Sequence, residues 1–144
     1  MVVGLQKFTG GTARRRASSP KLQVLNTALM SAQSGLPLKV ARQDTTFWGR
    51  MVESAIGAHL ANAAAVGICE VFYWRDRNRE VDFVVRVGKT LTAIEVKSGH
   101  SQESLPGMEA FADAFKPTCM LLVEGDGITV EEFLSKPVEH WVGV

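Results

Sequence analysis

The sequence is poor in three features that would point to a particular class of protein: cysteine, an excess of one charge, and long apolar runs. Its two cysteines, Cys69 and Cys119, lie in apolar surroundings, where we expect buried free thiols in a reducing compartment. The formal net charge is +1, so bulk charge does not predict nucleic-acid binding. No run reaches the roughly 18 apolar residues of a membrane span, and the start lacks a signal-peptide layout. We therefore expect a soluble, cytoplasmic protein that does not contact a membrane.

The composition fits one globular domain. The chain has 144 residues, of which 46% are hydrophobic and 22% charged, enough for a core of its own. Residues 1–17 differ from the rest, because they include the run GGTARRR, rich in glycine and arginine. We predict that residues 1–17 are a hairpin or linker, or the remnant of a preceding region, and that the domain occupies residues 18–144.

The spacing of apolar residues predicts the order helix, three strands, helix, strand, helix, preceded by a short strand and a helix turn within residues 21–33. The central segments are a helix over residues 46–65, strands over 68–74, 81–87 and 91–98, a helix over 104–115, a strand over 118–125 and a helix opened by Thr129 and Glu132. Short connections between the three strands predict an antiparallel meander. The strand after the helical crossover should pair in parallel. The predicted fold class is α/β (α+β), a mixed sheet flanked by helices.

The third predicted strand carries two ionisable residues that alternation places on one face, Glu95 and Lys97. Both faces of this strand are otherwise apolar, so charges there are costly unless they are paired or bound to something. Asp82 stands thirteen positions earlier, on the preceding strand, and an antiparallel pairing can bring it within reach of Glu95. An ordinary ion pair at a strand end is the alternative interpretation.

Glu53, on the first long helix, lies at the edge of the apolar stripe and can point toward the sheet. Three carboxylates that converge repel one another unless a cation lies among them, and oxygen ligands suit Mg²⁺ or Mn²⁺. Such a metal activates water and neutralises the charge of a phosphodiester during hydrolysis, and a lysine beside it can orient that water. This set predicts a metal-dependent nuclease, although a glutamate in the position of Glu53 is also typical of a solvated helix edge.

The stretch from Phe72 to Gly99 resembles the core of the PD-(D/E)XK nuclease-like superfamily. It is most similar to the domain of unknown function at the C-terminus of many prokaryotic AAA-type ATPases. The resemblance covers residues 18–140 and rests on the run Tyr73-Trp74-Arg75, on Glu80-Val81-Asp82-Phe83, on Ile94 to Gly99 and on the lead-in SSPKLQVLNTAL. The run Asn26-Thr27-Ala28-Leu29 departs from the usual Asp-Thr-Gly-Leu-like sequence.

The resemblance implies a restriction-endonuclease-like αβββαβ core, with metal positions at Asp82 and Glu95, the lysine at Lys97 and the helix acid at Glu53. It also implies DNA as a partner and an ATPase domain in the full-length protein. No ATP site is expected in this chain: Gly88-Lys89-Thr90 lacks the glycine that a phosphate-binding loop needs five positions earlier, where Phe83 stands.

Several alternatives stay open at this stage. Arg75, Arg77 and Arg79 could contact DNA phosphates, or they could form the solvated tip of a hairpin. Some members of the superfamily have lost catalysis, so an inactive module that docks DNA or a protein is the second interpretation. A component of a toxin–defence system or a mobile element is the third. Formation of a homo-oligomer is also left open.

Overall fold

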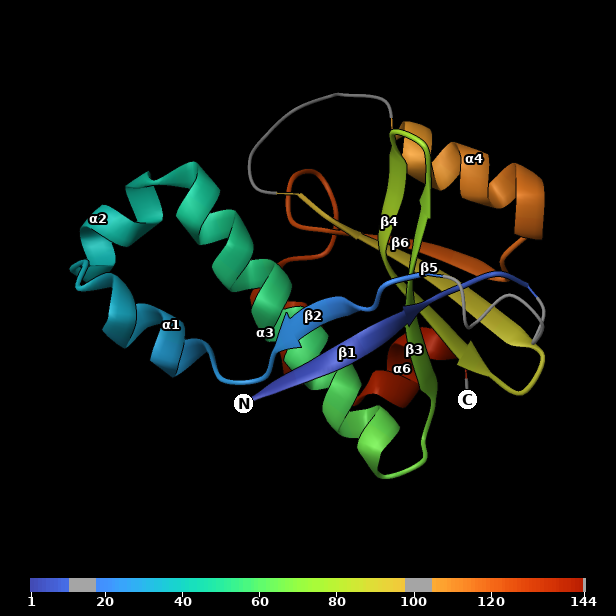
Figure 1. The fold of residues 1–144 in the computed structure, drawn as a ribbon, viewed down its shortest axis with the longest axis horizontal. Helices are drawn as coiled ribbons and strands as arrows, with labels where there is room; N and C mark the ends of the chain where they lie inside the picture. The colour runs from blue at the N-terminus through green and yellow to red at the C-terminus, as the bar shows by residue number, and fades with distance from the viewer. Residues whose placement is uncertain (11–17, 98–104, 144) are drawn as a thin grey trace.

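A computed structural model describes residues 1–10, 18–97 and 105–143 of the chain (Figure 1). Within these residues six strands form one mixed sheet in the order β2-β1-β3-β4-β5-β6. The strands are β1 (Val2–Lys7), β2 (Lys21–Val24), β3 (Glu70–Asp76), β4 (Arg79–Val87), β5 (Thr90–Val96) and β6 (Cys119–Val123). The helices are α1 (Thr27–Ser34), α2 (Leu38–Gln43), α3 (Thr45–Ala65), α4 (Pro106–Phe115), α5 (Val130–Ser135) and α6 (Val138–Val142).

The centre of the sheet is the predicted meander. β3, β4 and β5 pair antiparallel, and β6 pairs parallel with β5 after the α4 crossover. The tight turn between β3 and β4 places Arg77 at a φ of 54°, and the turn between β4 and β5 places Gly88 at a φ of 55°. The predicted fold class, a mixed sheet flanked by helices, is therefore confirmed.

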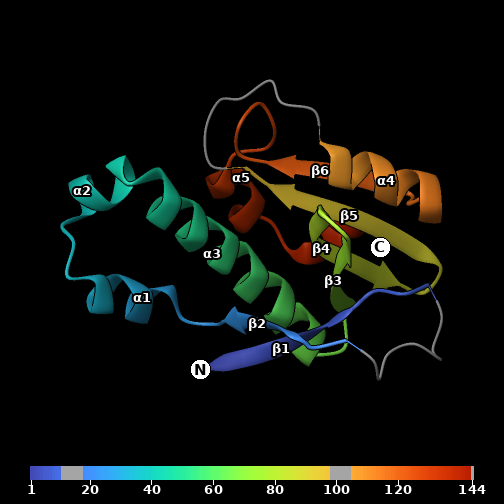
Figure 2. The same ribbon diagram turned by 45° about the horizontal axis from the view of Figure 1, so that its top comes forward.

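Alternating side chains along the strands pack into two separate hydrophobic cores, one on each face of the sheet. On β5, Ile94 enters a core built around α3, α5 and α6, whereas Ala93 enters a core covered by α4. In Figure 2, α4 runs along β5 and β6, away from α3. Because both faces are covered, β4 and β5 are central strands, and the residues in the middle of each strand lie between packed layers.

Helix α3 is set in place by its ends and its apolar stripe. The Asp44 side chain caps its start by accepting a hydrogen bond from the backbone of Phe47 at 2.9 Å. The buried positions Val52, Ile56 and Leu60 repeat every fourth residue and face the sheet. Glu53 follows Val52 and therefore lies at the margin of this buried stripe, as the sequence predicted.

Residues 1–10, the described part of the segment predicted as a hairpin or linker, contain a strand that joins the sheet. β1 pairs antiparallel with β2 and parallel with β3, and Leu5 and Phe8 are buried, one in each core. Residues 11–17, the rest of the predicted linker, lie outside the described residues. The strand was missed because Val2, Val3 and Gly4 are exposed, so β1 lacks the alternation of a half-buried strand.

The predicted helix turn after β2 corresponds to α1, which Gly35 ends in the left-handed region. The short helices α2 and α6 were missing from the prediction, and Pro37 directly precedes α2. Pro137 separates α5 from α6. In Figure 1, α1 and α2 project from the body beside the start of α3.

Cys69 and Cys119 are both free, and Cys69 is buried as expected, whereas Cys119 is only half-buried. Within the described part of the chain, no helix combines the length and the apolar character that crossing a bilayer requires.

Candidate active site

The candidate site begins where the β4–β5 ladder stops. The last paired residues on this side are Phe83 and Ile94. Just beyond them, Asp82 Oδ2 accepts a hydrogen bond from the backbone N–H of Val96 at 2.9 Å. The carboxylate therefore takes a backbone donor at the point where regular pairing ends, which fixes Asp82 beside the end of β5.

Glu95 and Lys97 lie together at this end of β5. Lys97 Nζ is 3.6 Å from Glu95 Oε1, within the range of an ion pair. Glu95 Oε2 is buried and has no hydrogen-bond partner among the described residues. A buried carboxylate oxygen without a donor is costly, so this site is suited to a bound proton or cation.

The acidities of Asp82 and Glu95 reflect this burial. Burial, followed by the negative charge of Glu53, raises the pKa of Asp82 to about 6, although the Val96 N–H and Lys21 oppose the shift. Burial, followed by the charge of Asp82, raises the pKa of Glu95 to about 7, against the opposing effect of Lys97. The two carboxyls disfavour each other's ionised form and so titrate as a pair.

Lys21, which the sequence analysis did not assign to the site, lies among its carboxylates. Its Nζ is 2.8 Å from Glu53 Oε1, 3.1 Å from Glu80 Oε1 and 3.7 Å from Asp82 Oδ1. Burial lowers the pKa of Lys21, but the hydrogen bond and charge of Glu53, with the charges of Asp82 and Glu80, outweigh it and raise the pKa overall. Lys21 is therefore a fixed positive charge. Its place in the SSPK lead-in was the one sign of it in the sequence.

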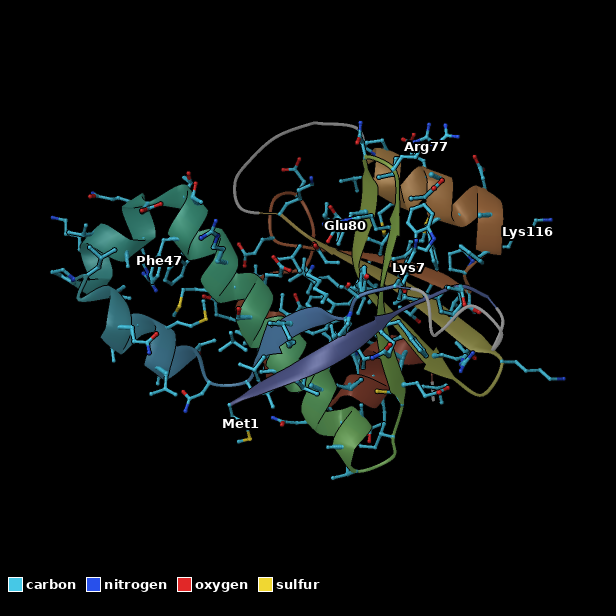
Figure 3. All side chains as sticks on the ribbon, in the orientation of Figure 1. Met1, Lys7, Phe47, Arg77, Glu80 and Lys116 are labelled. Atoms are coloured by element: carbon cyan, nitrogen blue, oxygen red, sulfur yellow. The ribbon has the colours of Figure 1, made fainter. Side chains whose placement is uncertain are left out.

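The predicted phosphate-contacting arginines separate into two kinds. Arg75 is held by Glu80, since its Nε donates to Glu80 Oε2 at 3.0 Å. Arg77 and Arg79 are exposed and form no ion pair within the described residues. Figure 3 shows Arg77 at the tip of the β3–β4 hairpin and Glu80 further down, on the side of β4 nearer α3. Of these three arginines, Arg77 and Arg79 are thus available to a ligand without loss of an ion pair seen among the described residues.

An open cavity of about 300 Å³ adjoins Glu53. It lies between the first turns of α3 and the end of β5, where Glu53 and Val96 form part of its wall. The other residues that line it are Thr46, Gly49 and Arg50. A ligand in this cavity would contact Glu53 directly and lie beside the strand end that carries Glu95 and Lys97.

The donor atoms fit a hard divalent cation in their chemistry. Glu53, Asp82 and Glu95 supply only carboxylate oxygens, the preferred ligands of Mg²⁺ and Mn²⁺, and Glu95 Oε2 still lacks a partner among the described residues. The described residues hold no group of three acidic, histidine or cysteine side chains arranged ready for a metal. Lys21 Nζ lies within ion-pair distance of two of the three acids, so a metal bridging all three would need Lys21 to move.

Fold and site together define an α/β domain with an acid-and-lysine cluster at the end of two central strands. The family model for a domain of unknown function, DUF4143, matches residues 48–134, more than half of the chain, and the chain belongs to that family. The match includes Glu53, Asp82, Glu95 and Lys97 but not Lys21. Neither the curated proteins nor the solved structures contain a match to this chain.

Proposed function

We propose that this domain is a metal-dependent nuclease of the PD-(D/E)XK type, a phosphodiester hydrolase that acts on DNA. The observation that supports it most is the meeting of Asp82 and Glu95 at one strand end, with Lys97 beside them and a buried Glu95 oxygen that has no partner among the described residues. An ordinary ion pair would satisfy both carboxylate oxygens, whereas in this part of the chain Glu95 Oε2 is left without a donor.

In this proposal Asp82, Glu95 and Glu53 hold Mg²⁺ or Mn²⁺. The bound ion would lower the pKa of water and neutralise charge on the phosphate. Lys97 is held near Glu95 and orients the attacking water by donating a hydrogen bond from Nζ. Val96 N–H fixes the orientation of Asp82 through Oδ2, and the second oxygen, Oδ1, lies 3.7 Å from Lys21 Nζ.

The DNA would lie across the cavity beside Glu53. Arg50 lines that cavity, and the exposed Arg77 and Arg79 at the hairpin tip are further candidates for phosphate contacts. Since phosphate contacts set affinity without reading sequence, these arginines would position the strand without selecting a cleavage sequence. The similarity of the motifs to domains appended to AAA-type ATPases supports a cytoplasmic protein whose full-length form includes such an ATPase.

The experiment is a cleavage assay with purified protein, Mg²⁺ or Mn²⁺, and linear, circular and branched DNA. Asp82→Ala and Lys97→Ala should each lower the cleavage rate by at least about 100-fold, because each removes a group that acts on the metal or its water. Asp113→Ala and Lys89→Ala change exposed residues of the same charge away from the site and should cut like the wild type. Uncut DNA in every wild-type reaction would contradict the proposal.

A second candidate function is a non-catalytic module that docks DNA or a protein. One observation favours it: Lys21 already neutralises part of the acid cluster without a metal. In that case the wild type binds DNA without cutting it, and Asp82→Ala and Lys97→Ala bind it as well as the wild type does.

A further inference from the structure

Lys21 reaches the carboxylates from a segment that is held on both sides. Before it, the Tyr73 hydroxyl donates a hydrogen bond to the backbone oxygen of Ser19 at 2.8 Å. After it, the Gln23 side chain, 4% exposed, donates to the backbone oxygen of Ser54 at 3.0 Å. Ser54 directly follows Glu53, so this bond fixes β2 next to the helix turn that carries the acid. The position of Lys21 is therefore set by the fold rather than by a chance contact of a long side chain.

The packing of Gln23 against α3 fixes the position of β2 along this helix. Gly57 provides the space: a side-chain Cβ at this position would lie 2.2 Å from Gln23 Oε1. The same Gln23 amide also donates to the backbone oxygen of Val24 at 2.8 Å. The Gln23 side chain is buried against Gly57, and its amide donates both of its hydrogen bonds to backbone oxygens. These contacts keep β2 in register with Glu53.

The ammonium of Lys21 and a divalent ion compete for the same oxygens. Its Nζ lies 2.8 Å from Glu53 and 3.7 Å from Asp82, two of the acids that the proposed nuclease assigns to the metal. An ammonium at hydrogen-bond distance from Glu53 occupies an oxygen that a metal would need as a ligand, and its charge opposes the entry of a doubly charged cation beside it. Lys21 and a metal ion therefore compete for Glu53 and Asp82.

We propose that Lys21 is the internal cation of this site. It neutralises Glu53, Glu80 and Asp82 in the metal-free protein, and a divalent ion enters only when the ammonium withdraws from Glu53 and Asp82. The proposal rests on the proposed function in taking these carboxylates as the metal site. It goes further by assigning to β2, outside the segment matched by the family model, control over how readily the metal binds.

The first test is a calorimetric titration of the full chain with Mn²⁺ alone. Lys21→Met, which keeps the length of the side chain and removes its charge, should bind Mn²⁺ at least about tenfold more tightly than the wild type. Lys89→Met is the matched control, since Lys89 is exposed at the β4–β5 turn and its loss changes the net charge equally. Affinity in Lys21→Met that equals or falls below that of the wild type and the control would overturn the proposal.

A second test uses the wild type and so does not depend on the folding of a variant. The rate at which an amine-reactive acylating reagent modifies Lys21 is followed by peptide mass spectrometry, with Lys89 as the internal reference. In EDTA, Lys21 should react slowly because its ammonium is paired with three carboxylates, and saturating Mn²⁺ should accelerate its acylation several-fold. An unchanged Lys21-to-Lys89 ratio at saturating Mn²⁺ would show that the lysine stays in place, against the proposal.

The two proposals can fail separately. DNA cleavage by the wild type, with no gain in Mn²⁺ affinity in Lys21→Met, would leave the nuclease proposal standing and overturn the role of Lys21. Tighter Mn²⁺ binding in Lys21→Met, with no cleavage by the wild type on any DNA, would leave Lys21 as the internal cation and overturn the nuclease proposal.

Discussion

At the scale of single residues, Glu95 determines how the site responds to pH. Its folded-state pKa of about 7 lies above the ordinary value of 4.5. The folded state therefore holds this proton more tightly than the unfolded state does, and stability falls as pH rises from about 4.5 through 7. Above that window, in the absence of metal, the protein bears the full cost of a buried, incompletely paired carboxylate.

Glu95→Gln should therefore stabilise the metal-free protein, and increasingly so at higher pH. We expect a gain on the order of 1–3 kcal/mol in the free energy of unfolding at pH 8 and little gain at pH 5. Urea unfolding in EDTA at both pH values measures it. A difference between variant and wild type that does not change with pH would contradict the raised pKa of Glu95.

Thr92 is a second residue with a buried polar atom that lacks a hydrogen-bond partner among the described residues. It is fully buried on β5, and its Oγ1 has no hydrogen-bond partner among the described residues. Thr92→Val keeps the shape and removes the hydroxyl, so it should leave stability unchanged or raise it by up to about 1 kcal/mol. The midpoint of thermal unfolding measures this, and a clear loss of stability would show that the hydroxyl has a partner.

At the scale of elements, α4 packs directly against the backbone of β4 at Gly107. A Cβ at Gly107 would lie 1.9 Å from the backbone oxygen of Glu80, so the helix rests directly on the strand that carries two of the site acids. Glu80 in turn contacts Lys21 and Arg75. The contact between α4 and β4 therefore supports the acid cluster from the opposite side of the sheet.

Gly107→Ala should push α4 away from β4 and cost about 2–4 kcal/mol of stability, since backbone atoms cannot yield as a flexible side chain can. Glu109→Ala, at an exposed position of the same helix, is the control and should change stability by less than about 0.5 kcal/mol. Chemical denaturation of both variants measures the difference. Equal stabilities would mean that α4 is not seated as described.

The positions of strands and helices were predictable where the spacing of apolar residues repeats with a clear period. The strands of the meander and the stripe of α3 repeat apolar residues at periods of two and about 3.6, which packing on a core requires. Helices α2 and α6, of six and five residues, are too short to show a period. The nearness of Asp82 to Glu95 followed from antiparallel pairing, but the position of Lys21 did not, because it depends on contacts between β2 and α3 that no local pattern encodes.

At the scale of the whole molecule, the N-terminal segment is part of the folded body. Phe8 is 6% exposed and packs against Phe72, Phe111 and Phe115, with ring centroids 5.6, 5.7 and 5.1 Å away. Its backbone N–H also donates a hydrogen bond to the backbone oxygen of Tyr73 at 2.7 Å. The segment thus links β1 to the core under α4, and β1 in turn pairs with β2, which carries Lys21.

Phe8→Ala should cost about 3–5 kcal/mol in the free energy of unfolding, the usual loss for a buried phenylalanine. Val2→Ala, at a residue that is 53% exposed, should cost less than about 0.5 kcal/mol. Urea unfolding of both variants measures the contrast. A small loss for Phe8→Ala would restore the interpretation of this segment as a linker.

The most direct test of the metal site is the anomalous diffraction of crystals grown or soaked with Mn²⁺. We predict one strong peak between the carboxylates of Asp82 and Glu95, with Glu53 turned toward it and Lys21 Nζ withdrawn from Asp82. Crystals at saturating Mn²⁺ that show no peak at this position, with Lys21 still paired to Glu53 and Asp82, would contradict it.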